Sequence, residues 1–289
     1  MLFRSVKKRC TNYLLLVAAG LVLAACSISR LAYMNAPPLA LWYVGGYVDM
    51  TDGQRNALRE KLTQGIAWHR ANELPEYQVA LEALIPKLGT RIAVQDVRST
   101  YALARDYYHR ALAHLLPDFA GIMLTLDDKQ LAQIERKFAD DNKKLVKESV
   151  KGPADERRAA RVKKYIQQFE DWTGKLSPAQ REIVARGVLP IPDLTDERLG
   201  DRRYRQLEAI NLVRLKPPRE KLVAELRRLL IDTESWRRPE YTKKLRERDE
   251  RVFEIVSELS ATLTPDQREH LQHKTRGYVK DISSIIASR

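Results

Sequence analysis

The chain has 289 residues, of which 44% are hydrophobic and 31% are charged, and its formal net charge is +13. This length is enough to bury a hydrophobic core in one or two domains. The only cysteines are Cys10 and Cys26, and Cys10 falls in a segment that we expect to be removed. The composition therefore excludes a disulfide-stabilised fold, and packing must supply the stability.

The N-terminus has the pattern of a signal peptide. Residues 1–12 contain four basic side chains and no acidic one, and an apolar run follows from Tyr13 to Ala25. At ~1.5 Å per residue, a helix of this length spans about 20 Å. The hydrocarbon core of a bilayer is ~30 Å thick, so the pattern favours a cleaved signal over a transmembrane helix.

The apolar run ends in Leu23-Ala24-Ala25-Cys26, which resembles the lipobox of bacterial lipoproteins. The resemblance implies that Cys26 becomes the lipidated first residue of the mature protein. An ordinary secretory signal followed by a chance cysteine is the alternative. Ser27, in place of Asp, is similar to the sorting pattern for the outer membrane. We therefore expect a lipid anchor at Cys26 and a protein that faces the periplasm.

Loss of the leader would leave 47 basic and 38 acidic residues, a net charge of +9. Outside the cytoplasm a basic protein does not meet nucleic acid. The expected partners are then the membrane through the lipid, anionic lipid or lipopolysaccharide, and unfolded or acidic envelope proteins. The alternative is that the excess Lys and Arg only solubilise helix surfaces.

The rest of the chain is rich in good helix formers and lacks strand signals. It predicts an all-α fold of roughly ten helices, in an antiparallel bundle or a curved array of helical hairpins. Residues 26–38 are expected to be a tether, and residues 39–289 a helical domain with candidate halves at 39–152 and 153–289. Pro117 is expected to kink or end its helix, and residues 187–192 to form a linker. The expected helices span 39–48, 52–72, 74–88, 94–117, 128–150 and 154–172, a short stretch after Ser177, 195–215, a stretch after Pro218, 240–263, and a last helix around 271–286.

A short pattern occurs four times, with Thr, Asp or Ser followed by Gln three residues later. This spacing predicts a capping box, in which the first side chain accepts a hydrogen bond from the backbone of the glutamine and the glutamine returns one. An apolar residue before each cap is expected to pack on an apolar residue in the following helix, such as Leu58, Leu131, Ile134, Ile183 or Leu271. The four pairs are Thr51 and Gln54, Asp127 and Gln130, Ser177 and Gln180, and Thr264 and Gln267.

Two copies of the pattern, at residues 176–180 and 263–267, resemble the LTxxQ motif of small periplasmic helical chaperones. Members of that family are cradle-shaped helical dimers that hold unfolded clients. The resemblance implies client binding, whereas the alternative is that the four copies are ordinary helix starts. The similar spacing within the first and second pairs of copies also suggests a duplication of two related halves.

The densest cluster of functional side chains is Trp68-His69-Arg70, followed by Glu73. Together with the lipobox and residues 41–43, it resembles a family of uncharacterised bacterial lipoproteins with no established activity. His69 and Glu73 are four residues apart on a helix and could share a proton. The alternative is structural, with Trp68 packed inward and Arg70 pairing with Glu73 or capping a helix end.

A second candidate binding cluster lies at the start of the basic segment 237–251 and consists of Trp236, just before the segment, and Arg237, Arg238 and Tyr241 within it. His270 and His273 could hold the edge of a metal, but they lack a convincing third ligand. There is no Gly-rich phosphate loop and no nucleophile motif.

We therefore expect no enzymatic activity, no cofactor and no metal. The expected function is that of a lipid-anchored periplasmic binding protein, chaperone-like in envelope homeostasis. The alternative is a structural or assembly accessory lipoprotein that docks one folded envelope partner.

Overall fold

The computed structural model describes residues 30–149 and 153–288. The expected signal peptide and Cys26 lie outside the described residues. Within these ranges there are eleven α-helices with defined bounds, a helical segment at residues 30–34, one short 3-10 helix and no strand, which confirms the all-α fold. The helices are α2 (Ala36–Gly45), α3 (Asp52–Asn72), α4 (Leu74–Lys87), α5 (Val94–Met123), α6 (Asp128–Ser149), α7 (Ala154–Thr173), α8 (Pro178–Val188), α9 (Thr195–Arg214), α10 (Arg219–Leu230), η1 (Thr233–Ser235), α11 (Pro239–Ala261) and α12 (Pro265–Ala287).

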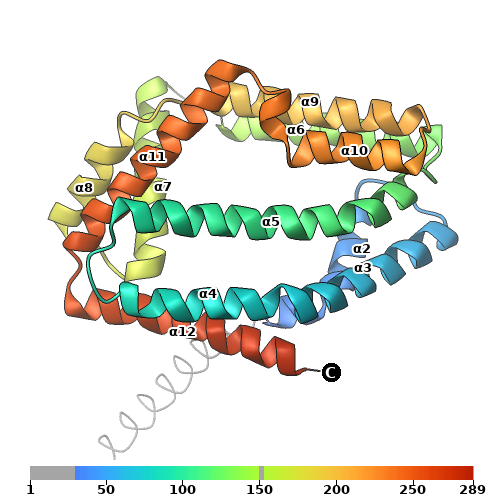
Figure 1. Cartoon of the computed structure of the whole chain (residues 1–289). Helices are drawn as coiled ribbons and strands as arrows, with labels where there is room; N and C mark the ends of the chain where they lie inside the picture. The colour runs from blue at the N-terminus through green and yellow to red at the C-terminus, as the bar shows by residue number, and fades with distance from the viewer. Residues whose placement is uncertain (1–29, 150–152, 289) are drawn as a thin grey trace, which may run out of the picture.

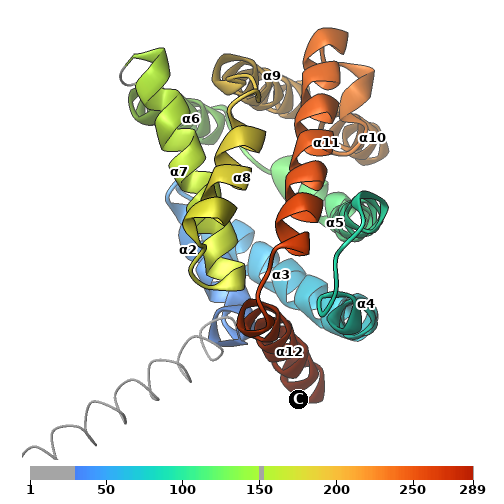
Figure 2. The same ribbon diagram turned by 90° about the vertical axis from the view of Figure 1, so that its left-hand side faces the viewer.

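The helices form an open, layered array (Figure 1). In this view α6, α9 and α10 form the upper layer, α5 crosses the middle, and α4 lies along α12 at the bottom. Helices α7, α8 and α11 close one end, and Figure 2 shows this end towards the viewer. Among the described residues, no helix is both long enough and apolar enough to cross a bilayer.

Two hydrophobic cores hold the array together. Core 1 is built from α2, α3, α5 and α6 together with α9 and α10, with Leu116 and Leu222 among its most buried side chains. Core 2 is built from the end of α4 and from α8, α11 and α12, with α7 packed against it. Each core therefore contains helices from both sides of residues 150–152, so packing joins the two stretches of chain.

Helix α5 connects the two cores, and its side chains in between are largely exposed. Leu116 and Ala120 near its C-terminal end belong to core 1, and Ile92 just before its start packs against core 2. Between these ends, residues 98–106 are all exposed. One side of this stretch lies against α11, where the ring of Tyr101 meets Phe253 (5.3 Å between centroids) and Arg98 pairs with Glu250. The stretch is still more open than usual, because helices in globular proteins normally bury one face.

The helices differ from the sequence prediction at three places. Helix α5 does not end at Pro117 but continues to Met123, because Leu116 and Ala120 on either side of the proline are buried in core 1. Helix α8 includes Gly187 and Val188, which we expected in a linker. In the segment expected to be a tether, residues 30–34 are helical and α2 begins at Ala36.

All four predicted capping boxes are present. The caps Thr51, Ser177 and Thr264 start α3, α8 and α12, and each exchanges hydrogen bonds with its glutamine. At the start of α6 the backbone N–H of Gln130 donates to the carboxylate of Asp127 (2.8 Å), and the N–H of Asp127 donates to the side chain of Gln130 (3.1 Å).

The predicted apolar contact behind each cap is recovered in a modified form. Residues Met50, Leu126, Leu176 and Leu263, which precede the caps, are all buried in the cores. The first position that could pack on them within the helix is a leucine only in α6, whereas the other three copies have arginine there. In those copies the apolar residue joining the same core lies one turn further along, at Leu58, Val184 and Leu271.

Candidate functional site

The cluster predicted around Trp68 is centred on Glu73, which ends α3 and begins α4. Its carboxylate is almost fully buried and accepts a hydrogen bond from Arg110 of α5 (2.9 Å). Arg110 also binds the exposed carboxylate of Glu76 (2.8 Å). A buried carboxylate needs such a partner, because burial of an unpaired charge costs several kcal/mol. Arg110 therefore ties α5 to the junction of α3 and α4.

His69 lies in an aromatic setting beside this ion pair. Its Nδ1 is 3.0 Å from the hydroxyl of Tyr33, and its ring meets the ring of Tyr77 edge-on with centroids 5.4 Å apart. Burial lowers the pKa of His69, and the charge of Glu73 opposes this effect. Burial, followed by the nearby Glu73 carboxylate, raises the pKa of Tyr77 to about 12. Within the described chain no hydrogen bond joins His69 to Glu73, so the two do not form the proton-sharing pair that their spacing allowed.

Trp68 and Arg70 have structural contacts. The ring of Trp68 stacks on His114 of α5, with centroids 3.6 Å apart and planes 8° from parallel. Arg70 does not pair with Glu73. It donates to the backbone carbonyl of Ser288 (2.8 Å), the residue that caps the C-terminal end of α12. Of the two structural roles predicted for Arg70, the structure therefore shows the cap of a helix end.

Most side chains of the second predicted cluster are also occupied by contacts with other residues of the protein. Arg237 donates to Asp201 of α9 (2.6 Å), and its guanidinium carbon lies 5.5 Å from the ring centroids of both Trp236 and Tyr241. The Trp236 ring stacks on Tyr204 (4.8 Å), and Tyr241 is buried. Arg238 is the one predicted member that is exposed and makes no ion pair with the described residues.

The surrounding basic segment carries little free positive charge. Apart from Arg238, every basic residue from 237 to 251 lies within 4 Å of a carboxylate. The pairs are Arg237 with Asp201, Lys243 with Glu247, Lys244 with Glu197, Arg246 with Glu234, Arg248 with Asp249, and Arg251 with Glu254. These pairs weaken the case for the segment as a cationic binding surface.

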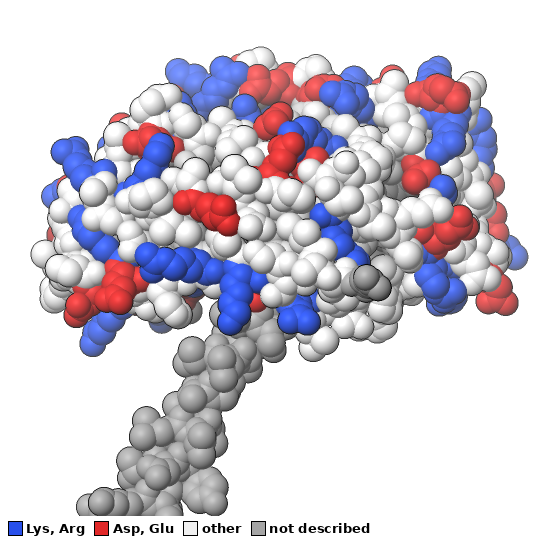
Figure 3. Space-filling model, turned by 60° about the horizontal axis from the view of Figure 1, so that its bottom comes forward, with Lys and Arg blue, Asp and Glu red and all other residues white. Residues whose placement is uncertain are grey.

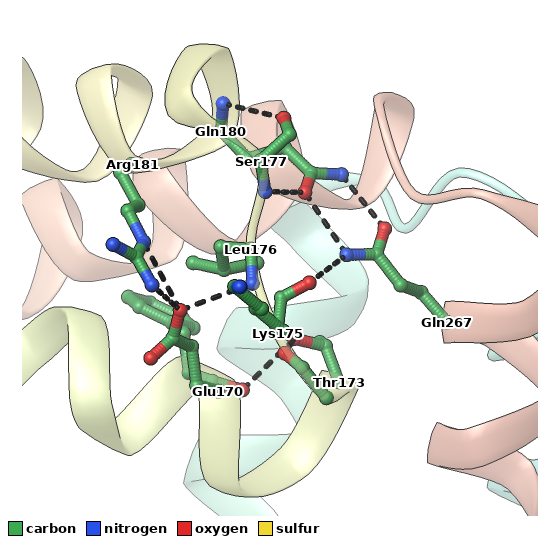
Figure 4. Close-up of polar contacts among 10 residues, drawn as sticks. Glu170, Thr173, Lys175, Leu176, Ser177, Gln180, Arg181 and Gln267 are labelled. Carbon is green, nitrogen blue, oxygen red and sulfur yellow. Dashed lines mark hydrogen bonds and ion pairs between the residues drawn. The ribbon is translucent and has the colours of Figure 1, made fainter.

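The glutamines of the capping boxes make a contact that sequence reasoning missed, and we call it the glutamine clasp. The side-chain amides of Gln180 and Gln267 exchange two hydrogen bonds (2.8 and 2.9 Å; Figure 4). Each Nε2 also donates to a backbone carbonyl before the other cap, Gln180 to Thr262 and Gln267 to Lys175 (both 2.9 Å). The clasp thus joins the starts of α8 and α12.

A second clasp has the same pattern. Gln54 and Gln130 exchange two hydrogen bonds (3.0 and 2.7 Å), and they donate to the carbonyls of Thr125 and Asp49, respectively. In both clasps the accepting carbonyl lies two residues before the partner's cap. The side chains of the four glutamines are engaged in hydrogen bonds within the protein, so these motif residues are not free to bind a client.

A groove with a volume of about 690 Å³ lies beside α2. It is lined by Trp42, Tyr43, Tyr47, Arg55 and Lys137, among others. The hydroxyl of Tyr47 donates to Asp141 (2.7 Å), and this bond lowers the pKa of Asp141. No group of three or more His, Cys, Asp or Glu residues suited to a metal is found in the described ranges.

Comparison with known proteins places the chain in a family. The model of a family of unknown function (DUF6279) matches residues 46–242. The chain belongs to this family. No curated protein matches it, and no solved structure does.

The DUF6279 match covers both predicted clusters and the clasp of Gln54 and Gln130. It includes Gln180 but ends before Gln267, so the clasp of these two glutamines joins a residue inside the matched region to one outside it. The N-terminal segment with the lipobox-like sequence and α2 also lies outside the match. The match therefore identifies the family but assigns no chemistry to a site.

Proposed function

We propose that this DUF6279 member is a lipid-anchored binding protein of the bacterial envelope, without enzymatic activity, that holds polypeptide clients in a chaperone-like manner. Leu23-Ala24-Ala25-Cys26 supports acylation at Cys26, and Ser27 supports placement in the outer membrane facing the periplasm. Both belong to the sequence and lie outside the described residues.

The observation that carries the binding role is the exposed middle of α5. Leu103 and Tyr108 are 41% and 59% exposed, and Tyr101, whose ring also meets Phe253 of α11, is 42% exposed. Exposed aromatic and aliphatic side chains on a rigid helix supply contact area at low entropic cost. An unfolded chain passing beside α5 could bury these side chains without any rearrangement of the two cores.

The proposal predicts that the purified protein without its anchor slows the aggregation of an unfolded client at a near-stoichiometric ratio. Replacement of Leu103 by Asp should remove most of this effect, because a charge would be placed in the apolar contact. The matched control is Leu189→Asp, since Leu189 is a leucine of similar exposure (47%) after α8. Equal activity of the two variants, or no slowing by the wild-type protein, would refute the client-holding role.

The alternative is an accessory lipoprotein that docks one folded envelope partner. The discrete position of the apolar side chains on α5, between two rigid cores, favours this version. A photo-crosslinking amino acid at position 103 in living cells separates the two. Many crosslinked species indicate clients, whereas one dominant species indicates a single folded partner.

A further inference from the structure

The start of the described chain has a composition unlike that of the rest. Residues 31–48 contain no charged side chain, although 31% of the residues in the whole chain are charged. This stretch is helical almost throughout, because the backbone bonds continue across Asn35. The N–H of Asn35 donates to the carbonyl of Leu31, and the N–H of Leu39 donates to the carbonyl of Asn35 (both 3.1 Å).

Both sides of this helical stretch are apolar. The inner side places Leu41, Val44 and Val48 in or against core 1. The outer side carries a stripe, which we call the α2 stripe, of side chains that are 50–79% exposed. The stripe consists of Leu31, Leu39, Trp42 and Tyr43. A helix on the surface of a water-soluble protein normally has a polar outer face, so this stripe requires an apolar or interfacial environment.

The residue types and their position in the chain fit the surface of a bilayer. Trp and Tyr are enriched at membrane–water interfaces, where an apolar ring with a polar edge is favourable. The stripe follows shortly after Cys26, whose proposed acylation would place a membrane next to α2. At about 1.5 Å per residue, the ten residues of α2 are too short to cross a bilayer and would lie on it.

Unpaired positive charges border the stripe. Arg55 lines the groove beside Trp42 and Tyr43, and Arg136 lines the adjoining groove at Gly45 and Gly46. Neither arginine makes an ion pair or a side-chain hydrogen bond with the described residues, in contrast to the paired arginines of segment 237–251. Figure 3 also shows basic side chains around the place where the described chain begins. Carboxylates also line these grooves, with Asp141 in the first and Asp49 and Asp140 in the second. Guanidinium groups bind phosphate oxygens well, so Arg55 and Arg136 are the groups suited to lipid phosphates.

We propose that the α2 stripe lies in the headgroup region of the membrane, with Leu39, Trp42 and Tyr43 inserted at the interface and Arg55 and Arg136 facing lipid phosphates. This proposal depends on the proposed lipid anchor only because the anchor would place the bilayer next to α2. The stripe would then act as a second point of attachment. It would fix the orientation of the helical array on the membrane, which a lipidated tether alone cannot do.

The test uses the full chain reconstituted into vesicles of phosphatidylethanolamine and anionic phosphatidylglycerol, in which part of the lipid is brominated near the headgroups. Bromine quenches only tryptophans that touch the bilayer. The chain has four tryptophans, and we expect quenching of the wild-type emission that Trp42→Phe abolishes. Because the Trp42 side chain is 79% exposed, this variant should keep the wild-type fold, which its circular dichroism spectrum would verify.

The matched control is Trp236→Phe. Trp236 follows η1, between α10 and α11, and its ring stacks on Tyr204 of α9, so quenching should persist in this variant. Persistent quenching in Trp42→Phe, or no quenching in the wild type, would overturn the proposal. The mass of the purified chain reports separately whether Cys26 is acylated, so a failure of the anchor and a failure of the α2 stripe give different results.

Discussion

Gln180 and Gln267 exchange two side-chain hydrogen bonds between the starts of α8 and α12, and Gln54 and Gln130 do the same between α3 and α6. In each pair the Oε1 atoms also accept from the backbone N–H groups of the caps. Each glutamine therefore caps its own helix and fastens a second one. Because all four glutamines make the same hydrogen bonds, they support the hypothesis that two related halves arose by duplication more strongly than their spacing in the sequence does.

The buried clasp should contribute measurably to stability. Replacement of Gln180 by Leu would leave the N–H of Ser177 and the carbonyl of Thr262 without their partner, and Gln267 without two of its bonds. Each unsatisfied buried group costs about 1–3 kcal/mol, so we expect the free energy of unfolding in urea to fall by about 3 kcal/mol. The control Gln64→Leu, at an exposed position of α3, should change it by less than about 0.5 kcal/mol.

A double-mutant cycle tests whether the two amides act as one unit. Gln180→Leu and Gln267→Leu remove the same pair of bonds, so the double variant should lose about 1 kcal/mol less than the sum of the single variants. Strict additivity would show that the caps contribute separately and that the clasp between them contributes nothing.

Local signals in the sequence predicted the helices and their caps, because a capping box depends only on residue types within four consecutive positions. The partner of each cap was not predictable, since the contact between Gln180 and Gln267 spans 87 residues. The same holds for Glu73, whose neighbour Arg70 was the natural candidate in sequence but whose partner is Arg110. The need for glycine at position 187 was also not predictable, because the sequence of one helix does not show how closely another helix packs against it.

Gly187 allows α8 to pack closely on α11. A Cβ at this position would lie 2.3 Å from Cγ1 of Ile255, a buried side chain of core 2. Gly187→Ala should therefore destabilise the fold by about 1–3 kcal/mol, as other overpacked cores do. Thermal unfolding would measure this effect, and Ile255→Ala should cost less stability in the Gly187→Ala chain than in the wild type, because it removes the clashing atom.

Gly200 in α9 provides the opposite case, because a Cβ there would meet no atom within 4 Å. Gly200→Ala should stabilise the fold by about 0.5–1 kcal/mol, since alanine restricts the unfolded chain and favours a helix. A loss of stability at Gly200, or none at Gly187, would contradict the packing described for α8 and α9.

The ion pair of Glu73 and Arg110 should matter more than that of Glu76 and Arg110. Glu73→Gln would remove a buried negative charge and leave Arg110 with only the exposed carboxylate of Glu76. Loss of one partner of a fully buried pair costs about 3–5 kcal/mol. Because Arg110 is 39% exposed, we expect a smaller cost of about 2 kcal/mol. Glu76→Gln should cost less than about 1 kcal/mol in the same urea titration. Equal costs would show that burial of Glu73 has no energetic effect.

His69 should make stability depend on pH in the acidic range. Burial lowers its pKa in the folded protein below the ordinary 6.5 of the unfolded chain. Between these two values the unfolded state binds more protons than the folded state, so stability rises with pH. The contribution is complete above pH 6.5 and is lost as the pH falls from there through the folded pKa. His69→Gln should therefore lose less stability than the wild type when the pH is lowered from 7 to 5 in urea titrations. His270→Gln, at an exposed position of α12, should keep the wild-type dependence. If the stability of His69→Gln depended on pH as that of the wild type does, protonation of His69 would not be coupled to unfolding. The contact between His69 and Tyr33 would then have to persist when the imidazole ring is charged.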